Sequence, residues 1–301
     1  MDEIPGFQKM MLPLLRFAGD KKEHSTKEAI EYLADFFNLS EDQKNKMLES
    51  GNQKVFSNRV NWARAYLKMA DLVNPTKKGH FKITDKGIKT LSENPPEINL
   101  KYLNRFPEYL EVKASWKKNP DTENEILTPQ TPEELLESSY LDIRKALAQE
   151  ILTKIKTCSP SFFERMVVEL LVKMGYGGSI SDAGKAIGKS GDEGIDGIIK
   201  EDKLGLDIIY IQAKRWESVV GRPEIHKFVG ALAGQGAKKG IFITTSKFTK
   251  EANEYVPKNE TKIVLIDGAL LAELIIDYNL GISTQTVYEI KKLDSDYFEE
   301  E

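Results

Sequence analysis

The segment that most constrains the fold is a nearly continuous apolar run over residues 206–213. Such a run favours a strand that is buried on both faces of a covered sheet over a half-exposed edge strand. Gln212 lies inside the run and Lys214 follows it. Because side chains alternate along a strand, we expect Gln212 and Lys214 to project to the same face.

An acidic residue is expected beside these two. Residues 191–197 are rich in glycine and acids, and the polar segment 201–205 is typical of a hairpin connection. If the strand that begins near Asp196 pairs with the apolar strand, Asp196 joins Gln212 and Lys214 on one face. A buried charged group costs on the order of several kcal/mol unless it is paired or bound to metal, so this grouping indicates a site.

The chemistry that suits these groups is phosphodiester hydrolysis. Asp196 and Gln212 would bind Mg2+ through oxygen atoms, which are the ligands that this hard cation prefers. Lys214 would orient or help to deprotonate the attacking water and would offset the charge that builds up on the phosphate.

The same residues carry a resemblance to a known family. Asp196 with Gln212-Ala213-Lys214 resembles the Asp…(Asp/Glu)-x-Lys nuclease superfamily in its Gln-x-Lys variant. The longer strings at 210–216, 220–224 and 240–246 are similar to those of the Mrr type IV restriction endonucleases, and the likeness extends over nearly the whole chain. It implies a restriction-endonuclease-like α/β domain with a central mixed sheet, Mg2+ as cofactor, and Asp196, Gln212 and Lys214 as catalytic positions.

Glu164 is a further candidate. It shares its side of an expected helix with Val168 and Leu171 instead of with the charged stripe. In one interpretation it lies at the helix boundary or pairs with a buried base, and in the other it faces the metal site. The resemblance favours the second, because such nucleases often carry an acidic residue on the helix before the sheet. Glu164 would then compensate for the weaker amide ligand Gln212.

The first 95 residues predict a winged-helix domain. Ser25 and Glu28 form a capping box before a helix, a further helix is expected over 56–70, and a basic turn at 74–80 joins two short strands. Between residues 53 and 90, nine Lys and Arg residues face only two acids. This local positive charge favours DNA binding, although solvated lysines or a protein partner would also explain it.

The DNA-contacting residues are expected on this helix and this turn. Amide and guanidinium groups match the pattern of donors and acceptors in the major groove, and lysines contact phosphates. A Gly-rich loop over 184–190 lacks the spacing of an ATP-binding loop. Its two lysines, Lys185 and Lys189, either contact the DNA backbone or are ordinary loop residues. The candidates are Asn58, Arg59, Asn61, Trp62, Arg64, Lys77, Lys78, Lys82 and Lys189.

A linker is expected between the domains. Residues 119–139 hold six acids, three prolines and no base, so we predict an extended linker over 96–138 and a catalytic domain over 139–301. Thr131 and Pro132 would open a helix reaching about residue 155. This helix either packs on the nuclease core or pairs with another subunit.

Several functional classes are disfavoured. Cys158 is the sole cysteine, which excludes an internal disulfide and a cysteine-ligated zinc site and agrees with a cytoplasmic location. No apolar run is long enough to span a bilayer, so no membrane partner is expected.

The sequence therefore predicts a DNA-reading winged helix joined to a Mg2+-dependent endonuclease. By resemblance, its substrate would be modified, and specifically methylated, foreign double-stranded DNA, cut in a restriction role. Because one site cuts one strand, a homo-oligomer is expected. A repair or junction-resolving nuclease would prefer branched DNA, and a non-catalytic DNA-binding regulator would bind without metal-dependent cutting.

Overall fold

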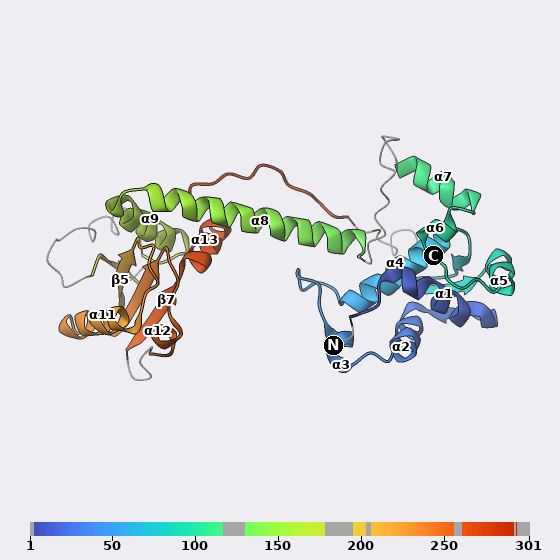
Figure 1. Cartoon of the computed structure of the whole chain (residues 1–301), viewed down its shortest axis with the longest axis horizontal. Helices are drawn as coiled ribbons and strands as arrows, with labels where there is room; N and C mark the ends of the chain where they lie inside the picture. Colours follow the sequence, from blue (N-terminus) through green and yellow to red (C-terminus); the bar gives the residue numbers. More distant parts are fainter. Residues whose placement is uncertain are drawn as a thin grey trace. The chain divides into compact units, whose positions relative to one another are not determined.

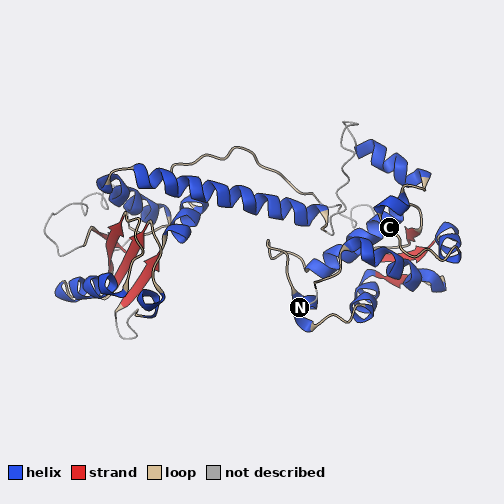
Figure 2. Cartoon of the chain, viewed as in Figure 1, coloured by secondary structure: helices blue, strands red, loops and turns tan. Residues whose placement is uncertain are grey.

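The computed structural model of the chain describes residues 3–116, 130–177, 195–202, 206–255, 261–291 and 293. The chain divides into two compact units, which are Met1–Leu141 with Lys291–Glu301, and Asp142–Ile290. Each unit has its own hydrophobic core, and each contains helices and strands (Figures 1 and 2). Each unit is therefore described by itself.

The first unit has the element order of a winged helix. A three-stranded antiparallel sheet of order β1-β3-β2 lies beside the helices. The capping box of Ser25 and Glu28 is present at the start of the second helix, as predicted. The elements are α1 (Phe7–Phe17), β1 (His24–Ser25), α2 (Thr26–Phe36), α3 (Glu41–Asn45), α4 (Val55–Met69), β2 (Val73–Pro75), β3 (His80–Ile83) and α5 (Asp85–Ser92).

The core of this unit is formed by one face of each main helix and by the sheet. Leu14 of α1, Leu33 of α2, Leu67 of α4 and Phe81 of β3 are almost completely buried in one cluster. Their burial fixes α4 against α1 and α2, so the orientation of α4 follows from ordinary apolar packing.

The expected linker over 96–138 is not extended in its described part. It contains α6 (Leu100–Leu103) and α7 (Pro107–Trp116), and Leu103 and Tyr109 are buried in the core of the first unit. The prediction was wrong here because the acids and prolines that indicate a linker lie in residues 119–139. The apolar residues of α6 and α7, which precede them, pack into the core. Residues 117–129 lie outside the described part of the chain.

The second unit holds a mixed four-stranded sheet of order β4-β5-β6-β7, as expected. β4 and β5 are antiparallel neighbours, whereas β5, β6 and β7 are parallel. The elements are the end of α8 (Pro132–Thr157), α9 (Pro160–Lys173), β4 (Gly197–Lys200), β5 (Ile208–Lys214), α11 (Arg222–Gly234), β6 (Lys239–Thr244), α12 (Lys250–Glu254), β7 (Lys262–Ile266) and α13 (Gly268–Asp277).

Helices cover both faces of this sheet (Figure 2). Ile211 and Ala213 of β5 belong to the core that contains residues of α9 and α13. Phe242 of β6 packs in the opposite core with Phe228 of α11. The alternation along the strands therefore separates two cores, which is the covered sheet that the apolar run predicts.

The long helix α8 is fixed to the second unit near its middle and at its end. Arg144 pairs with Glu273 and Asp277 of α13. Arg215, which follows β5, donates a hydrogen bond to the backbone carbonyl of Lys156. Among the described residues, no helix is long and apolar enough to cross a membrane.

Candidate active site and nucleic-acid interface

The hairpin of β4 and β5 places Asp196 against the end of β5. The backbone N–H of Asp196 donates to the carbonyl of Ile211 at 2.9 Å, and Gly197 is the register partner of Ile211. The Asp196 carboxylate accepts a hydrogen bond from the Ala213 N–H at 2.8 Å. The backbone pairing itself thus fixes this carboxylate.

Lys214 completes a partly buried ion pair with Asp196. Its Nζ lies 3.2 Å from Asp196 Oδ2, and the two side chains are 25% and 16% exposed, respectively. Gln212, two residues earlier on β5, is only 8% exposed. Because Ile211 and Ala213 point into the core beneath α9, Gln212 and Lys214 share the other face of the strand.

Glu164 belongs to the same electrostatic environment. It lies on α9, which packs against β4 and β5 and is capped by the Ser159 hydroxyl. Burial raises the pKa of Glu164, the negative charge of Asp196 raises it further, and Lys214 opposes the shift. Asp196, Lys214 and Glu164 are therefore close enough to interact, although they come from three elements.

These groups suit a hard divalent cation. Two carboxylates and an amide supply oxygen donors, which Mg2+ prefers to nitrogen or sulfur. A cation between Glu164 and Asp196 would relieve the repulsion that helps to raise the pKa of Glu164. Within the described ranges, no three His, Cys, Asp or Glu side chains form a metal-binding group, so Gln212 would be needed as a ligand.

Two buried threonines at the end of β6 hold the backbone beside the site. The carbonyl of Lys214 accepts hydrogen bonds from Thr244 Oγ1 at 3.0 Å, from the Thr245 N–H at 3.3 Å and from the Trp216 N–H at 3.0 Å. Thr244 and Thr245 are 0% and 3% exposed. Two hydroxyl groups at the end of the apolar stretch over residues 240–246 are the sequence signal for this role.

Two of the residues expected to contact DNA are instead buried. Asn58 and Arg59 are 1% and 8% exposed. The Arg59 guanidinium donates to Glu134 at 2.9–3.2 Å and to the backbone carbonyls of Ile4 and Pro5. Their expected outward position was wrong, because residues at the start of α8 cover this side of α4.

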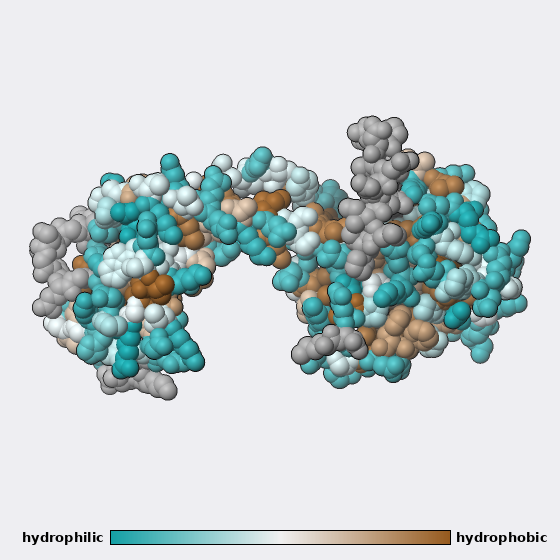
Figure 3. All heavy atoms as spheres, in the orientation of Figure 1, coloured by the Kyte–Doolittle hydropathy of each residue, from teal (hydrophilic) through white to brown (hydrophobic). Residues whose placement is uncertain are grey.

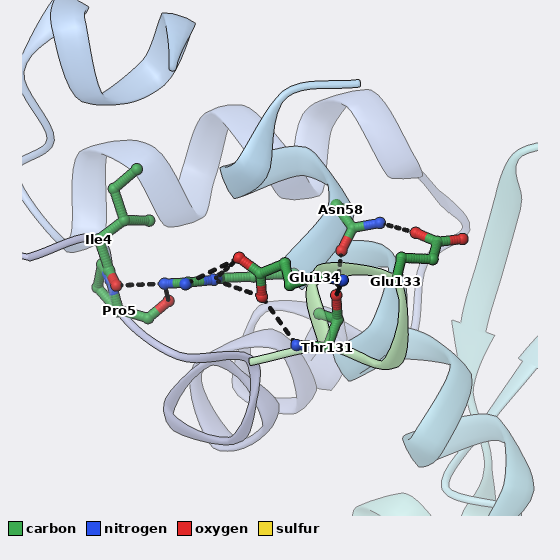
Figure 4. A network of polar contacts seen from close by, with 7 residues as sticks. Ile4, Pro5, Asn58, Thr131, Glu133 and Glu134 are labelled. Atoms are coloured by element: carbon green, nitrogen blue, oxygen red, sulfur yellow. Dashed lines mark hydrogen bonds and ion pairs between the residues drawn. The ribbon is translucent and has the colours of Figure 1, made fainter. Parts of the chain in front are cut away.

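Asn58 is part of the same polar network. Its Oδ1 accepts a hydrogen bond from the Thr131 hydroxyl at 2.7 Å, and its Nδ2 contacts Glu133 (Figure 4). Thr131 and Glu134 also cap each other, since the Thr131 N–H donates to Glu134 and the Glu134 N–H donates to the Thr131 hydroxyl. The predicted helix start at Thr131 is present and serves as the attachment of α8 to α4.

The remaining candidates on α4 are partly exposed. Asn61 is half-buried, and Trp62 packs against the core with its ring 5.8 Å from that of Tyr66. Arg64 donates to the Thr26 hydroxyl and lies 5.9 Å from the centre of the Phe81 ring. Arg64 thus contacts both α2 and β3, and these contacts limit its freedom to reach a base.

The lysines of the β2–β3 hairpin, which forms the wing, are exposed as expected. Lys78 and Lys82 lie on the surface, and Lys77 pairs with Glu23 at 2.7 Å while remaining 62% exposed. Lys68 on α4 is also exposed, although it is not among the residues expected to contact DNA. Lys189 lies outside the described residues.

Comparisons with known proteins identify both parts of the chain. Residues 155–275 match the family model described as "Restriction endonuclease", and residues 7–93 match the "Mrr N-terminal domain". The chain is 37% identical over 307 residues to the "Type IV methyl-directed restriction enzyme EcoKMrr" of Escherichia coli (strain K12), which covers 98% of this chain and 99% of that one.

Two solved structures also resemble parts of the chain. The "DNA modification-dependent restriction endonuclease AspBHI" has a TM-score of 0.34 and 17% identity, covering 46% of this chain and 36% of its own. The "MspJI Restriction Endonuclease in Complex with 27-mer Oligonucleotide" has a TM-score of 0.28 and 17% identity, covering 65% and 47%. On the full-length match and the two domain matches, the chain belongs to the Mrr family of type IV, modification-dependent restriction endonucleases.

Proposed function

We propose that this chain is a Mg2+-dependent endonuclease that hydrolyses phosphodiester bonds of methylated foreign double-stranded DNA in the cytoplasm. The observation that carries the proposal is the 3.2 Å ion pair of Asp196 and Lys214, with buried Gln212 on the same strand face. A restriction endonuclease needs an anionic metal ligand and a cation at one phosphate, and this pair supplies both.

Asp196, Glu164 and Gln212 would hold the metal through oxygen atoms. When bound there, Mg2+ would supply positive charge at the scissile phosphate and would make water more acidic. The hydrogen bond from the Ala213 N–H keeps the Asp196 carboxylate oriented for this task. Gln212 adds a ligand without adding a third negative charge, which limits repulsion between Asp196 and Glu164.

Lys214 would act on the water and on the phosphate. Its ammonium is held beside Asp196, and the Lys214 side chain is 25% exposed. There it would orient the attacking water and stabilise the charge that develops on the phosphate oxygens. Because the ion pair with Asp196 already holds the ammonium in place, no free energy is spent on positioning it during the reaction.

The winged-helix unit would supply DNA binding. Lys77, Lys78 and Lys82 on the wing and Lys68 on α4 would contact phosphates, with Asn61 and Trp62 as candidates for contacts in the groove. The Escherichia coli relative is named as a methyl-directed enzyme, which supports methylated DNA as the substrate. Lys189 is retained as a candidate contact to the DNA backbone.

The direct test is a cleavage assay with Mg2+ on methylated, unmethylated and branched DNA, comparing wild type with Asp196→Ala and Lys214→Ala. We expect cutting of methylated DNA alone, its loss in both variants and its loss in EDTA. DNA affinity measured by fluorescence anisotropy should be retained in both variants. Full cutting by either variant would reject the assigned site, and cutting of branched DNA alone would reject the substrate.

A further inference from the structure

A pocket opens in the first unit where α2, α3 and α4 meet. Its volume is about 340 Å³, which is near the lower end of the range of about 300–1,000 Å³ in which proteins bind small ligands. Around α2 the molecular surface carries hydrophobic atoms among hydrophilic ones (Figure 3). The lining residues of this α2–α4 pocket are Ile30, Glu31, Ala34, Asp35, Lys44, Lys54, Phe56 and Ser57.

The accessible side of α4 begins at this pocket. Ser57, Asn61 and Arg64 are partly exposed and Lys68 is exposed. They follow one another at intervals of four, three and four positions, so they form one stripe along the helix. In helix-turn-helix units, of which the winged helix is one form, the first residues of the recognition helix contact base edges. The pocket at the start of α4 would therefore lie at the base edges.

One wall of the α2–α4 pocket is apolar. Phe56 and Ala34 are 1% and 5% exposed and belong to the core of the unit, and Ile30 is partly buried against that core. Their packing fixes the position of this wall. In the major groove, a methyl group on a base is recognised by apolar contact. The wall therefore offers such a contact to a methylated base, and an unmethylated base cannot make it.

The rim of the pocket carries two carboxylates. Glu31 and Asp35 lie one turn apart on α2, and their side chains are 66% and 83% exposed. Their ion pairs with Lys27 and Lys44 are 4.0 and 3.9 Å long, which is beyond hydrogen-bond distance. A carboxylate accepts a hydrogen bond from an exocyclic amino group of a base. 5-Methylcytosine and N6-methyladenine both carry a methyl group beside an exocyclic N–H, so both match this combination of an apolar wall and an acidic rim.

A lysine beside the pocket is suited to the DNA backbone. Lys54, directly before α4, is exposed, and its ammonium donates a hydrogen bond to Asn45 at 2.7 Å. An ammonium there would contact a phosphate and would offset the repulsion between the two carboxylates and the DNA.

We propose that the α2–α4 pocket receives the methyl group of the modified base, with a carboxylate of its rim accepting the neighbouring N–H and Lys54 contacting the adjacent phosphate. This inference rests on the proposed function, because it takes methylated DNA as the substrate. It adds the surface that distinguishes methylated from unmethylated DNA.

The first test is binding of the full-length chain, in EDTA to prevent cutting, to three duplexes of one mixed sequence. They carry a methyl group on C5 of every cytosine, on N6 of every adenine, or on no base. Wild type should bind at least one methylated duplex at least about fivefold more tightly than the unmethylated one, since a good base contact discriminates by that factor or more. Fluorescence anisotropy measures the ratio, and the duplex that is preferred identifies the base.

Variants that change the shape of the pocket should abolish this preference. Ser57→Leu fills the pocket and should bring the affinity ratio close to one, and Ile30→Ala, which shortens the apolar wall without adding bulk, should lower it. Ser92→Leu places the same side chain at an exposed site on α5 and should keep the wild-type ratio. A wild-type ratio in both Ser57→Leu and Ile30→Ala, or equal binding of the three duplexes by wild type, would overturn the proposal.

Lys54→Met separates the phosphate contact from the reading of the base. It should weaken binding to all three duplexes by a similar factor and reduce the slope of log affinity against log salt by about 1. An unchanged slope would overturn the role of Lys54.

Cleavage separates this proposal from the proposed function. Asp196→Ala should keep the preference for methylated DNA in binding, and Ser57→Leu should lose the preference in cutting. Methyl-dependent binding that is lost in Ser57→Leu, together with no cutting by wild type in Mg2+, would reject the endonuclease proposal and leave the pocket intact. Cutting of methylated DNA alone by both wild type and Ser57→Leu would do the reverse.

Discussion

The hydroxyl of Thr244 donates a hydrogen bond to the backbone carbonyl of Lys214 at 3.0 Å, from a position that is completely buried. The same hydroxyl accepts a hydrogen bond from the Ser246 N–H at 3.2 Å. The end of β6 therefore fixes the end of β5 at the residue whose ammonium pairs with Asp196. This arrangement connects a core side chain to the geometry of the proposed active site.

Thr244→Val should lower the cleavage rate by about 10²-fold at unchanged DNA affinity, because a displacement of about 1 Å at a reacting group costs on that order. Thr244→Ser, which keeps the hydroxyl, should restore most of the rate. Single-turnover cleavage and fluorescence anisotropy provide the two measurements. A purely structural role predicts instead a loss of about 1 kcal/mol in stability with an unchanged rate well below the melting temperature.

The raised pKa of Glu164 predicts a specific dependence of stability on pH. Between the ordinary glutamate value and the raised one, the folded chain binds a proton that the unfolded chain has released, so stability in EDTA falls as pH rises through this window. Glu164→Gln should remove this component and should melt at a higher temperature than wild type at neutral pH. Calorimetry at several pH values in EDTA measures the effect.

The same residue should make cleavage sensitive to acid. Protonated Glu164 cannot act as an anionic ligand, so the rate should fall below the raised pKa, and higher Mg2+ concentration should move this limb to lower pH. Glu169→Gln, on the same helix, is a suitable control because Glu169 is exposed. An acid limb that does not respond to Mg2+ would argue against Glu164 as a ligand.

Gln212→Glu tests the role of the amide. A third carboxylate in this 8% exposed position should lower the melting temperature in EDTA, because it adds an unneutralised negative charge beside Asp196 and Glu164. It should also tighten Mg2+ binding, and the melting temperature should then rise more steeply with Mg2+ than in wild type. Gln235→Glu, at an exposed position, should show neither change.

Much of this architecture follows from local sequence rules. The apolar run ending at Lys214 predicts a covered strand, and the period of two places Gln212 and Lys214 on one face, as the cores on either side of β5 show. The helix starts at Ser25 and Thr131 follow from capping, which involves residues only three positions apart. These features depend on neighbours in the chain and on periodicity.

The features that could not be predicted depend on distant residues. Asn58 and Arg59 look outward on a wheel of α4 alone, and only Thr131 and Glu134, more than seventy positions later, make that side an interior. The role of Thr244 likewise requires the parallel pairing of β5 and β6, which brings it beside Lys214. Tertiary contacts decide such positions, and helical periodicity carries no information about them.

A matched pair of variants, Arg59→Met and Lys68→Met, distinguishes the buried side of α4 from its exposed side. Arg59→Met should destabilise the chain by about 3–5 kcal/mol, because it leaves Glu134 buried without its partner. Lys68→Met changes an exposed position on the same helix and should leave stability nearly unchanged. Denaturant unfolding measures both effects.

DNA binding should respond in the opposite way. Lys68→Met should weaken binding and reduce the slope of log affinity against log salt by about 1, since one phosphate contact is lost.

Arg59→Met combined with Glu134→Leu should recover much of the stability that Arg59→Met loses, because apolar groups can replace a buried ion pair. This double variant should also bind DNA with the wild-type salt slope. A reduced slope in this double variant would show that Arg59 contacts phosphate, and its burial against Glu134 would then not describe the DNA-bound state.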